Sequence, residues 1–465
     1  MLRVALPSSV VAIGAFWACA APARTTGSGP GEAQTAGEPG PAASGTAASA
    51  AKEGEEDLRI DGYLSSRLRG RWRGGDSDLD LDEVLWLEIG DPEKDRLSGR
   101  LMASVLADLD GHEDASSPLF SLADTYDLSV HARIFEAYAD VKSSKLRTLR
   151  LGRQMIWGTP ELAWFDGALV ETPEWRRERI KLGAYGGVPV HLYESSPEGD
   201  AIAGVYVEQR PWSGARARLD WMHLEDERRT AEHQDDLFGL GLWQGIGRSA
   251  RVEARYTNVE GTSRDVRAAA TWFDVDRAFL VQLSHYRLLE TQTALALEID
   301  PFSETLHALF PYDQTRVLAS KGFGESLDLQ LGADLRRVSD EGDIGVFNHD
   351  FERYFVTGSL PKALPADLEL ALTLEAWESD PTDVRTWGAD LSRRFGERLD
   401  LSLGSSYALY EYDALLGRER DDVRTTYLRG RWRKSKRTSF EAGYEYQDDD
   451  LEDTHVVRLG TTWRF

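Results

Sequence analysis

Apolar and polar residues alternate with a period of two along most of the chain between Leu58 and Phe465. The segment Leu58–Arg73 shows this pattern most clearly. Its apolar face comprises Ile60, Gly62, Leu64, Leu68, Gly70 and Trp72, and its polar face Arg59, Asp61, Tyr63, Arg67, Arg69, Arg71 and Arg73. Successive side chains of a β-strand point to opposite faces, so the segment predicts a strand between two different surroundings.

The last segment, Val456–Phe465, alternates in the same way. One face carries Val457, Leu459, Thr461, Trp463 and Phe465, and the other carries Val456, Arg458, Gly460, Thr462 and Arg464. An arginine facing hydrocarbon costs about 2–4 kcal/mol near the bilayer midplane, so the arginine faces must meet water. Taken alone, the segment also suits an edge strand of a soluble sandwich. The recurrence of the pattern favours a wall between lipid and water.

Further alternating segments pair through short turns, which predicts antiparallel hairpins. These pairs are Arg133–Lys142 with Leu146–Gln154, Arg179–Tyr185 with Pro189–Ser195, Ile202–Gln209 with Ala215–Leu224, Leu237–Gln244 with Ser249–Asn258, Asp265–Phe273 with Ala278–Arg287, Phe351–Ser359 with Leu368–Trp377, Val384–Arg394 with Leu399–Tyr410, and Arg424–Arg433 with Thr438–Gln447. Counting by parity gives roughly 22 strands, and 18 or 20 also fit. We therefore predict an all-β, transmembrane, antiparallel β-barrel with an even number of strands.

The residues before this region predict export from the cytoplasm. Residues 1–23 have the charge, apolar core and small-residue site of a signal peptide, and residues 24–57 have the composition of a disordered linker, expected in the periplasm. The barrel is expected over 58–465. Cleavage after Ala23 is preferred, while lipidation of Cys19, the only cysteine, stays open.

Composition narrows the class of function. The net charge of −25 argues against a nucleic-acid ligand, and the chain beyond its N-terminus has no apolar run long enough for a membrane helix. No catalytic motif and no histidine pair with metal spacing occurs, so we expect no enzyme activity, cofactor or metal. Asp76–Asp80 begins like a calcium loop, but Leu81 and Leu87 stand where glycine and glutamate are needed, so we interpret it as a solvated hairpin loop.

One stretch resembles a known group of barrels. A segment ending in Leu151-Gly152-Arg153-Gln154 is followed by Phe165-Asp166-Gly167 and by a predicted hairpin around Gly186-Gly187. This order, together with the C-terminal Phe465 typical of a closing strand, resembles the alginate-export and related porin families of bacterial outer-membrane barrels. The resemblance implies an arginine-lined path for an anionic polysaccharide. It also implies that Arg153 is a cation of the lumen or rim and that Asp166 organises a loop.

Arginines on the predicted inner faces are the candidate lining of this path. They are Arg67, Arg69, Arg71, Arg73, Arg153, Arg216, Arg218, Arg251, Arg255, Arg429, Arg431 and Arg433. They would either select anions or pair across strands with inward acids. Pairing is the favoured interpretation for any single arginine, whereas few acids are expected beside those of the first and last strands.

The predicted function is a passive, arginine-lined path for polysaccharide export across the outer membrane. A general or anion-selective porin and a plugged barrel that serves as a surface scaffold are the alternatives. Trp157–Glu178 and Leu289–Asp313 would either fold into the lumen or pack over the rim. Expected partners are outer-membrane lipid and lipopolysaccharide, a polar or anionic saccharide and a periplasmic polysaccharide-export protein, with no nucleic acid.

Overall fold

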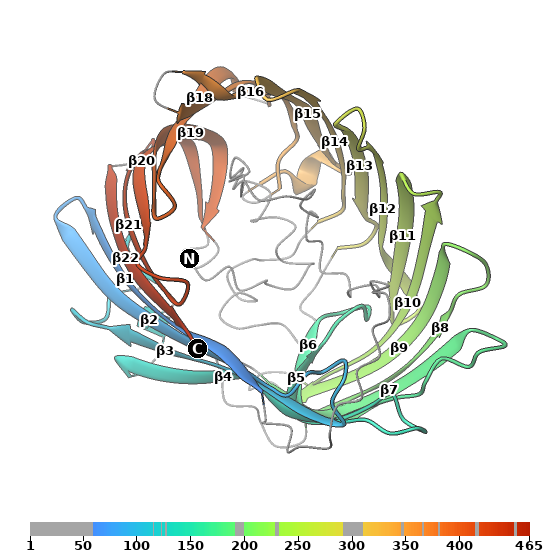
Figure 1. Cartoon of the computed structure of the whole chain (residues 1–465). Helices are drawn as coiled ribbons and strands as arrows, with labels where there is room; N and C mark the ends of the chain where they lie inside the picture. The colour runs from blue at the N-terminus through green and yellow to red at the C-terminus, as the bar shows by residue number, and fades with distance from the viewer. Residues whose placement is uncertain are drawn as a thin grey trace, which may run out of the picture.

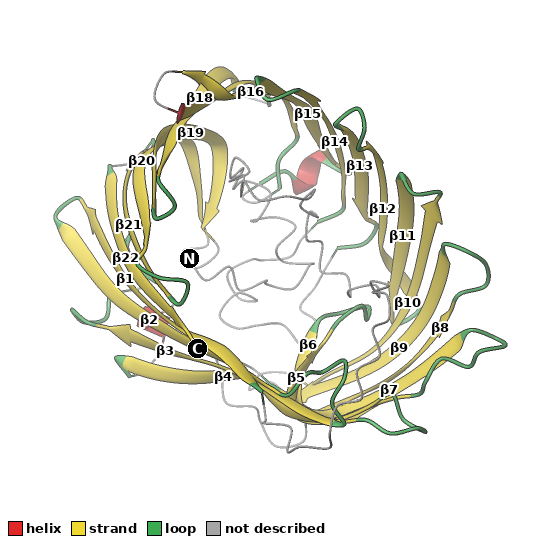
Figure 2. Cartoon of the chain, viewed as in Figure 1, coloured by secondary structure: helices red, strands yellow, loops and turns green. Residues whose placement is uncertain are grey.

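The computed structural model describes residues 59–465 except 115, 122, 126–127, 191–199, 228–231, 292–309, 346–347, 365–366, 380–381, 414–417 and 451–452. The predicted signal peptide and linker lie outside the described residues. Almost every described element is a strand (Figure 2). The strands are β1 Ile60–Arg73, β2 Asp76–Ile89, β3 Leu97–Asp108, β4 Val130–Val141, β5 Thr148–Ile156, β6 Ala163–Glu171, β7 Ile180–Pro189, β8 Ala201–Gln209, β9 Ala215–Glu227, β10 Glu232–Ile246, β11 Ala250–Val259, β12 Thr262–Asp274, β13 Phe279–Leu288, β14 Tyr312–Phe323, β15 Leu327–Val338, β16 Phe351–Leu364, β17 Leu368–Glu378, β18 Asp383–Phe395, β19 Leu399–Asp413, β20 Arg418–Arg433, β21 Thr438–Asp448 and β22 Thr454–Arg464.

These strands form a closed antiparallel barrel of 22 strands within the described residues, which confirms the predicted fold class. Each strand pairs with its neighbours in the sequence, and β1 also pairs with β22 (Figure 1). The C-terminal residue completes this pairing, because Phe465 and Gly62 exchange two backbone hydrogen bonds of 3.1 and 3.2 Å. The expectation that a phenylalanine strand closes the barrel is confirmed.

The described part of the chain contains only short helical turns, η2 (Ala123–Thr125) and η3 (Glu341–Asp343). Neither is long and apolar enough to cross a membrane.

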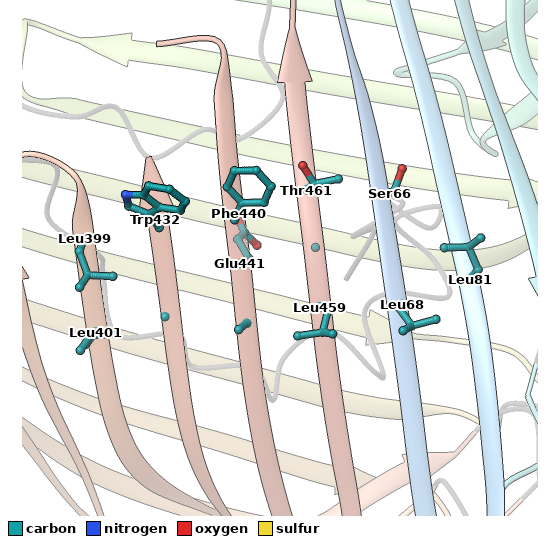
Figure 3. Close-up of a pocket in the computed structure, with 13 residues that line it drawn as sticks. Ser66, Leu68, Leu81, Leu399, Leu401, Trp432, Phe440, Glu441, Leu459 and Thr461 are labelled. Atoms are coloured by element: carbon teal, nitrogen blue, oxygen red, sulfur yellow. The ribbon is translucent and has the colours of Figure 1, made fainter. Parts of the chain in front are cut away.

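The outer face of the barrel is apolar, as the alternation predicts. At the closing seam, side chains from β19 to β22, β1 and β2 line one shallow depression (Figure 3). Leu459 and Trp432 belong to it and are 49% and 46% exposed in the isolated barrel. Burying such side chains in hydrocarbon releases the water that would otherwise cover them, so a bilayer is the solvent that suits this face.

The two rims of the barrel differ. β1 begins and β22 ends at one rim, here called the terminal rim, where connections such as Gly247–Ser249 are short. At the opposite rim, here called the loop rim, lie the longer connections 109–129, 289–311 and 339–350. Gathering of the longer connections at one rim is usual in bacterial outer-membrane barrels. The acidic stretch Asp226–Asp236 lies at the loop rim, where its described part prolongs β9 and β10.

Two local predictions were wrong. Gly186 and Gly187 do not turn the chain, because β7 runs straight through them. A Cβ atom on Gly187 would lie 2.2 Å from the carbonyl oxygen of Asp166. Glycine is therefore needed here because β6 and β7 approach each other closely. Asp76–Asp80 is not a solvated loop either, since it forms the first part of β2 after the two-residue turn Gly74-Gly75.

Two adjacent substitutions in β19 test whether alternate side chains of a strand face lipid and water. Leu403 is outward and 51% exposed, whereas Ser402 pairs with the inward Arg429. Leu403→Arg should lower the free energy of unfolding in lipid vesicles by about 2–4 kcal/mol, while Ser402→Arg should change it little. Urea titration of refolded protein measures both. Equal costs for the two variants would contradict the assignment of faces.

Candidate functional site

The candidate site is the inner wall of the barrel, where charged side chains face one another across strands. On β1 and β2 the register places Arg67 opposite Asp82, Arg69 opposite Asp80 and Arg71 opposite Asp78. Arg69 bonds Asp80, and the Nε atom of Arg71 lies 2.7 Å from Asp78 Oδ2. The expectation that acids are scarce at this seam was therefore wrong, because β2 supplies them in register.

The first and last of these arginines differ in their contacts. Arg73 reaches across to Asp449, 3.2 Å away, beside the loop rim. The Nη1 atom of Arg67 is buried and donates no hydrogen bond within the described residues. The seam is thus a ladder of opposite charges that continues from β2 through β1 toward the β21–β22 connection.

The same pairing continues on the other side of the closure. Arg429 donates to Glu445 at 2.8 Å, Arg431 donates to Glu441 at 2.7 Å, and Arg433 bonds Asp400. These three arginines are on the inner face of β20, as predicted. Each has an acid as partner, which agrees with the cross-strand interpretation rather than with a row of unpaired cations.

A hairpin folds into the lumen and occupies part of it. β5 and β6 lean into the ring of strands (Figure 1), and their connection, 157–162, contacts the inner side of β11 and β12. Arg255 Nη2 donates to the carbonyl oxygen of Gly158 at 2.8 Å. Arg264 pairs with Glu161 at 2.8 Å and donates to the Pro160 carbonyl at 3.0 Å. Of the two positions expected for Trp157–Glu178, the described contacts favour infolding. The other loop, Leu289–Asp313, lies mostly outside the described residues.

Apolar packing fixes this hairpin to the wall. Ile156 and Phe165 from the hairpin are buried in one cluster with inward side chains of β7 to β10. The other buried members are Ala163, Tyr185, Ile202, Tyr206, Met222, Leu224 and Leu237. Burying an aliphatic or aromatic side chain contributes about 1.5–3 kcal/mol, so the hairpin is a fixed constriction rather than a loose flap.

The remaining predicted arginines of β9 and β11 are also engaged. Arg218 makes a bidentate pair with Asp220, from Nη2 to Oδ1 at 2.7 Å and from Nε to Oδ2 at 3.0 Å, and its guanidinium lies 3.9 Å from the centre of the Tyr206 ring. Arg251 pairs with Glu253 at 2.7 Å. Arg216 lies 3.9 Å from the centre of the Trp243 ring. Inward arginines therefore stack on aromatic rings as well as pairing with acids.

Arg153 does not line the lumen. It makes a bidentate pair with Asp166 at 2.7 and 2.8 Å. Asp166 stands opposite the outward, 47% exposed Val188, so this pair lies on the outer face. The role that the family resemblance implied for Arg153 is corrected. The sequence held the contrary signal, because Arg153 shares the parity of Leu149 and Leu151.

Two loop-rim connections also reach the inner wall. Leu119, in the β3–β4 connection, is buried and accepts a hydrogen bond from Arg71 through its carbonyl oxygen. In the β15–β16 connection, His349 lies 2.7 Å from Glu419 of β20, and its ring stacks on Tyr410. No alternation marks these segments, so the sequence reasoning missed them together with Arg264 and Glu161.

The infolded hairpin should come loose when its ion pair is removed. In a Cys19→Ser background, Pro160→Cys gives a single thiol at the hairpin tip. Adding Glu161→Ala should speed labelling of that thiol by a soluble maleimide at least severalfold, because Arg264 keeps its pair with Asp265 on β12 but loses the buried partner that joins it to the hairpin. Glu253→Ala, which breaks the exposed pair with Arg251, is the matched control and should leave the rate unchanged. Equal rates in all variants would contradict a fixed hairpin.

The outer pair should behave as a lipid-facing ion pair. Arg153→Ala or Asp166→Ala should each cost about 3 kcal/mol of unfolding free energy in vesicles, because the other charge is left unpaired against hydrocarbon. The double variant Arg153→Leu with Asp166→Leu should recover most of that loss. Urea titration of the three variants measures the coupling, and additive losses would argue against the pair.

Comparisons with known proteins identify the fold. No family model and no curated protein sequence matches the chain. Among solved structures, the siderophore receptor PirA from Pseudomonas aeruginosa superposes with a TM-score of 0.51 at 12% identity over 88% of this chain and 80% of that one. The copper transporter OprC has the same TM-score at 9% identity, with coverage of 88% and 80%. OccAB3 from Acinetobacter baumannii has a TM-score of 0.42 at 10% identity, with coverage of 88% and 100%. At these identities the likeness concerns the fold alone: the chain is a 22-stranded β-barrel like those of outer-membrane proteins.

Proposed function

We propose that this protein is an outer-membrane barrel that gives polar solutes a passive path across the membrane. The observation that carries the proposal is the contrast between the two faces of one closed wall. The outer face is apolar, whereas the inner face carries ladders of charged pairs from β19 through β22 to β1 and β2. A charged inner face needs water, and a barrel of this strand number encloses enough space to hold it.

Hydroxylated solutes, saccharides above all, suit this wall. Paired arginines and carboxylates offer hydrogen-bond donors and acceptors side by side without a large net field. Aromatic rings lie among them, with Arg429 4.2 Å from the centre of the Tyr427 ring and Tyr63 stacked on Trp86 at 5.8 Å. The finer form of the proposal is the export of a polysaccharide delivered by a periplasmic partner. Because most of the inward arginines are paired with acids, anion selectivity receives less support than passage of polar solutes.

A plugged barrel with a scaffold role is the second candidate. It is supported by the infolded β5–β6 hairpin and by the two loop-rim connections that contact the inner wall. The two candidates differ in one property, the passage of ions and sugars through the folded barrel.

Conductance decides between these candidates. Refolded full-length protein should form steady channels in planar bilayers and admit oligosaccharides into proteoliposomes. A folded barrel without conductance or uptake would overturn the channel and favour the scaffold. Deleting the gene and assaying surface polysaccharide tests the finer proposal, since unchanged polysaccharide in a conducting wild type would argue against export.

Charge substitutions at the seam should shift ion selectivity in opposite directions. Arg69→Gln with Arg71→Gln leaves Asp80 and Asp78 unpaired, so the channel should become severalfold more selective for cations. Asp78→Asn with Asp80→Asn should make it more selective for anions. Reversal potentials in a salt gradient measure both changes. Identical ion selectivity in the two double variants would show that the seam does not line the solute path.

A further inference from the structure

The β3–β4 connection brings together three side chains with metal-binding atoms. Asp108 ends β3, His112 follows it, and Asp124 lies in η2. One ligand atom from each lies within 4.8 Å of the others, which holds for no other such trio within the described residues. His112 Nδ1 is 3.3 Å from Asp108 Oδ2. We infer that these three side chains form a binding site for a divalent transition-metal cation of the zinc type.

The second observation that supports a bound cation is that the buried side chain of Asp108 has one oxygen without a hydrogen-bond donor. Its side chain is only 1% exposed, yet its Oδ2 atom accepts no hydrogen bond from any described residue. The other oxygen, Oδ1, accepts from the backbone N–H groups of Asp110 and Gly111 at 3.2 and 2.9 Å. Leaving a buried carboxylate oxygen without a donor is costly. A cation at Oδ2, on the side of His112, removes that cost.

The remaining ligands are held in place before a metal binds. Asp124 accepts backbone hydrogen bonds at both oxygens, from Glu113 at 2.9 Å and from Ser121 at 2.6 Å. Each oxygen keeps a lone pair for a cation. An imidazole with two carboxylates suits zinc and its neighbours better than calcium or magnesium, which prefer more oxygen ligands. Three protein ligands leave a fourth position for water.

The site lies where it would hold the connection against the inner wall. Ser121, whose N–H bonds Asp124, donates through its hydroxyl to Asp80 at 3.4 Å, and the carbonyl of Leu119 accepts from Arg71. A cation that joins Asp108 to Asp124 therefore ties this connection over the charged ladder of β1 and β2. The effect of that tie on transport rests on the proposed channel function, whereas the metal site itself does not.

Metal binding is tested on the full-length protein refolded in detergent, stripped with EDTA and titrated with Zn²⁺ against a chromophoric chelator. One zinc per chain is expected, and both Asp108→Asn and His112→Ala should weaken it by at least about 10-fold. The matched control is His223→Ala, which removes a histidine 3.0 Å from Asp236 and should change nothing. Heat-modifiable migration on gels verifies that each variant is folded, and His112, being partly exposed, is the substitution least prone to disturb folding.

Wild-type affinity in folded Asp108→Asn and His112→Ala, or no binding by the wild type, would overturn the site. A conductance experiment then tests separately whether the metal holds the β3–β4 connection over the channel. Zn²⁺ should lower the conductance of the wild type and leave that of His112→Ala unchanged. If zinc binds and conductance does not change, the proposed effect of the metal on transport is wrong, while the metal site itself is supported. If the wild type never conducts, the channel proposal fails and the titration still decides the site.

Discussion

The hydrogen-bonded closure of β1 on β22 is the interaction on which the rest of the structure depends. Within hydrocarbon every backbone N–H and C=O group needs a protein partner, and an open sheet would leave two edges without one. The exchange of hydrogen bonds between Gly62 and Phe465 continues the ladder to the last residue of the chain. Once the sheet is closed, every strand has one face toward lipid and one toward the lumen.

The charged ladders follow from that division. Inward arginines of β1 and β20 face acids across the strands, and the partners Asp78 and Asp80 on β2 are buried beneath their arginines. An exposed ion pair such as Arg431 with Glu441 contributes little by itself, on the order of 0–1 kcal/mol. Buried networks such as Arg353 between Asp334 and Glu375 are stronger constraints. The exposed pairs thus set the polarity of the lumen more than the stability of the barrel.

The infolded β5–β6 hairpin narrows the lumen of this wide barrel. Two inward arginines of the facing wall, Arg255 and Arg264, donate hydrogen bonds to backbone carbonyl groups of residues 158–160 at the tip of the hairpin. Residues that would otherwise face the open lumen therefore position the constriction. The same holds for Arg71, which bonds the β3–β4 connection as well as Asp78. The infolded segments thus decide which charges of the inner wall remain accessible.

The sequence by itself determined the barrel, its two faces and its closing strand, because a period of two is a local property that each segment carries independently. Arg153 was wrongly counted among the inner-face arginines, although it shares the parity of the outward, 49% exposed Leu151. Only the tertiary structure decided which charges meet, since Arg69 finds Asp80 through the β1–β2 register and Arg264 finds Glu161 across the lumen. Register and infolding depend on contacts between distant segments, and no single segment encodes them.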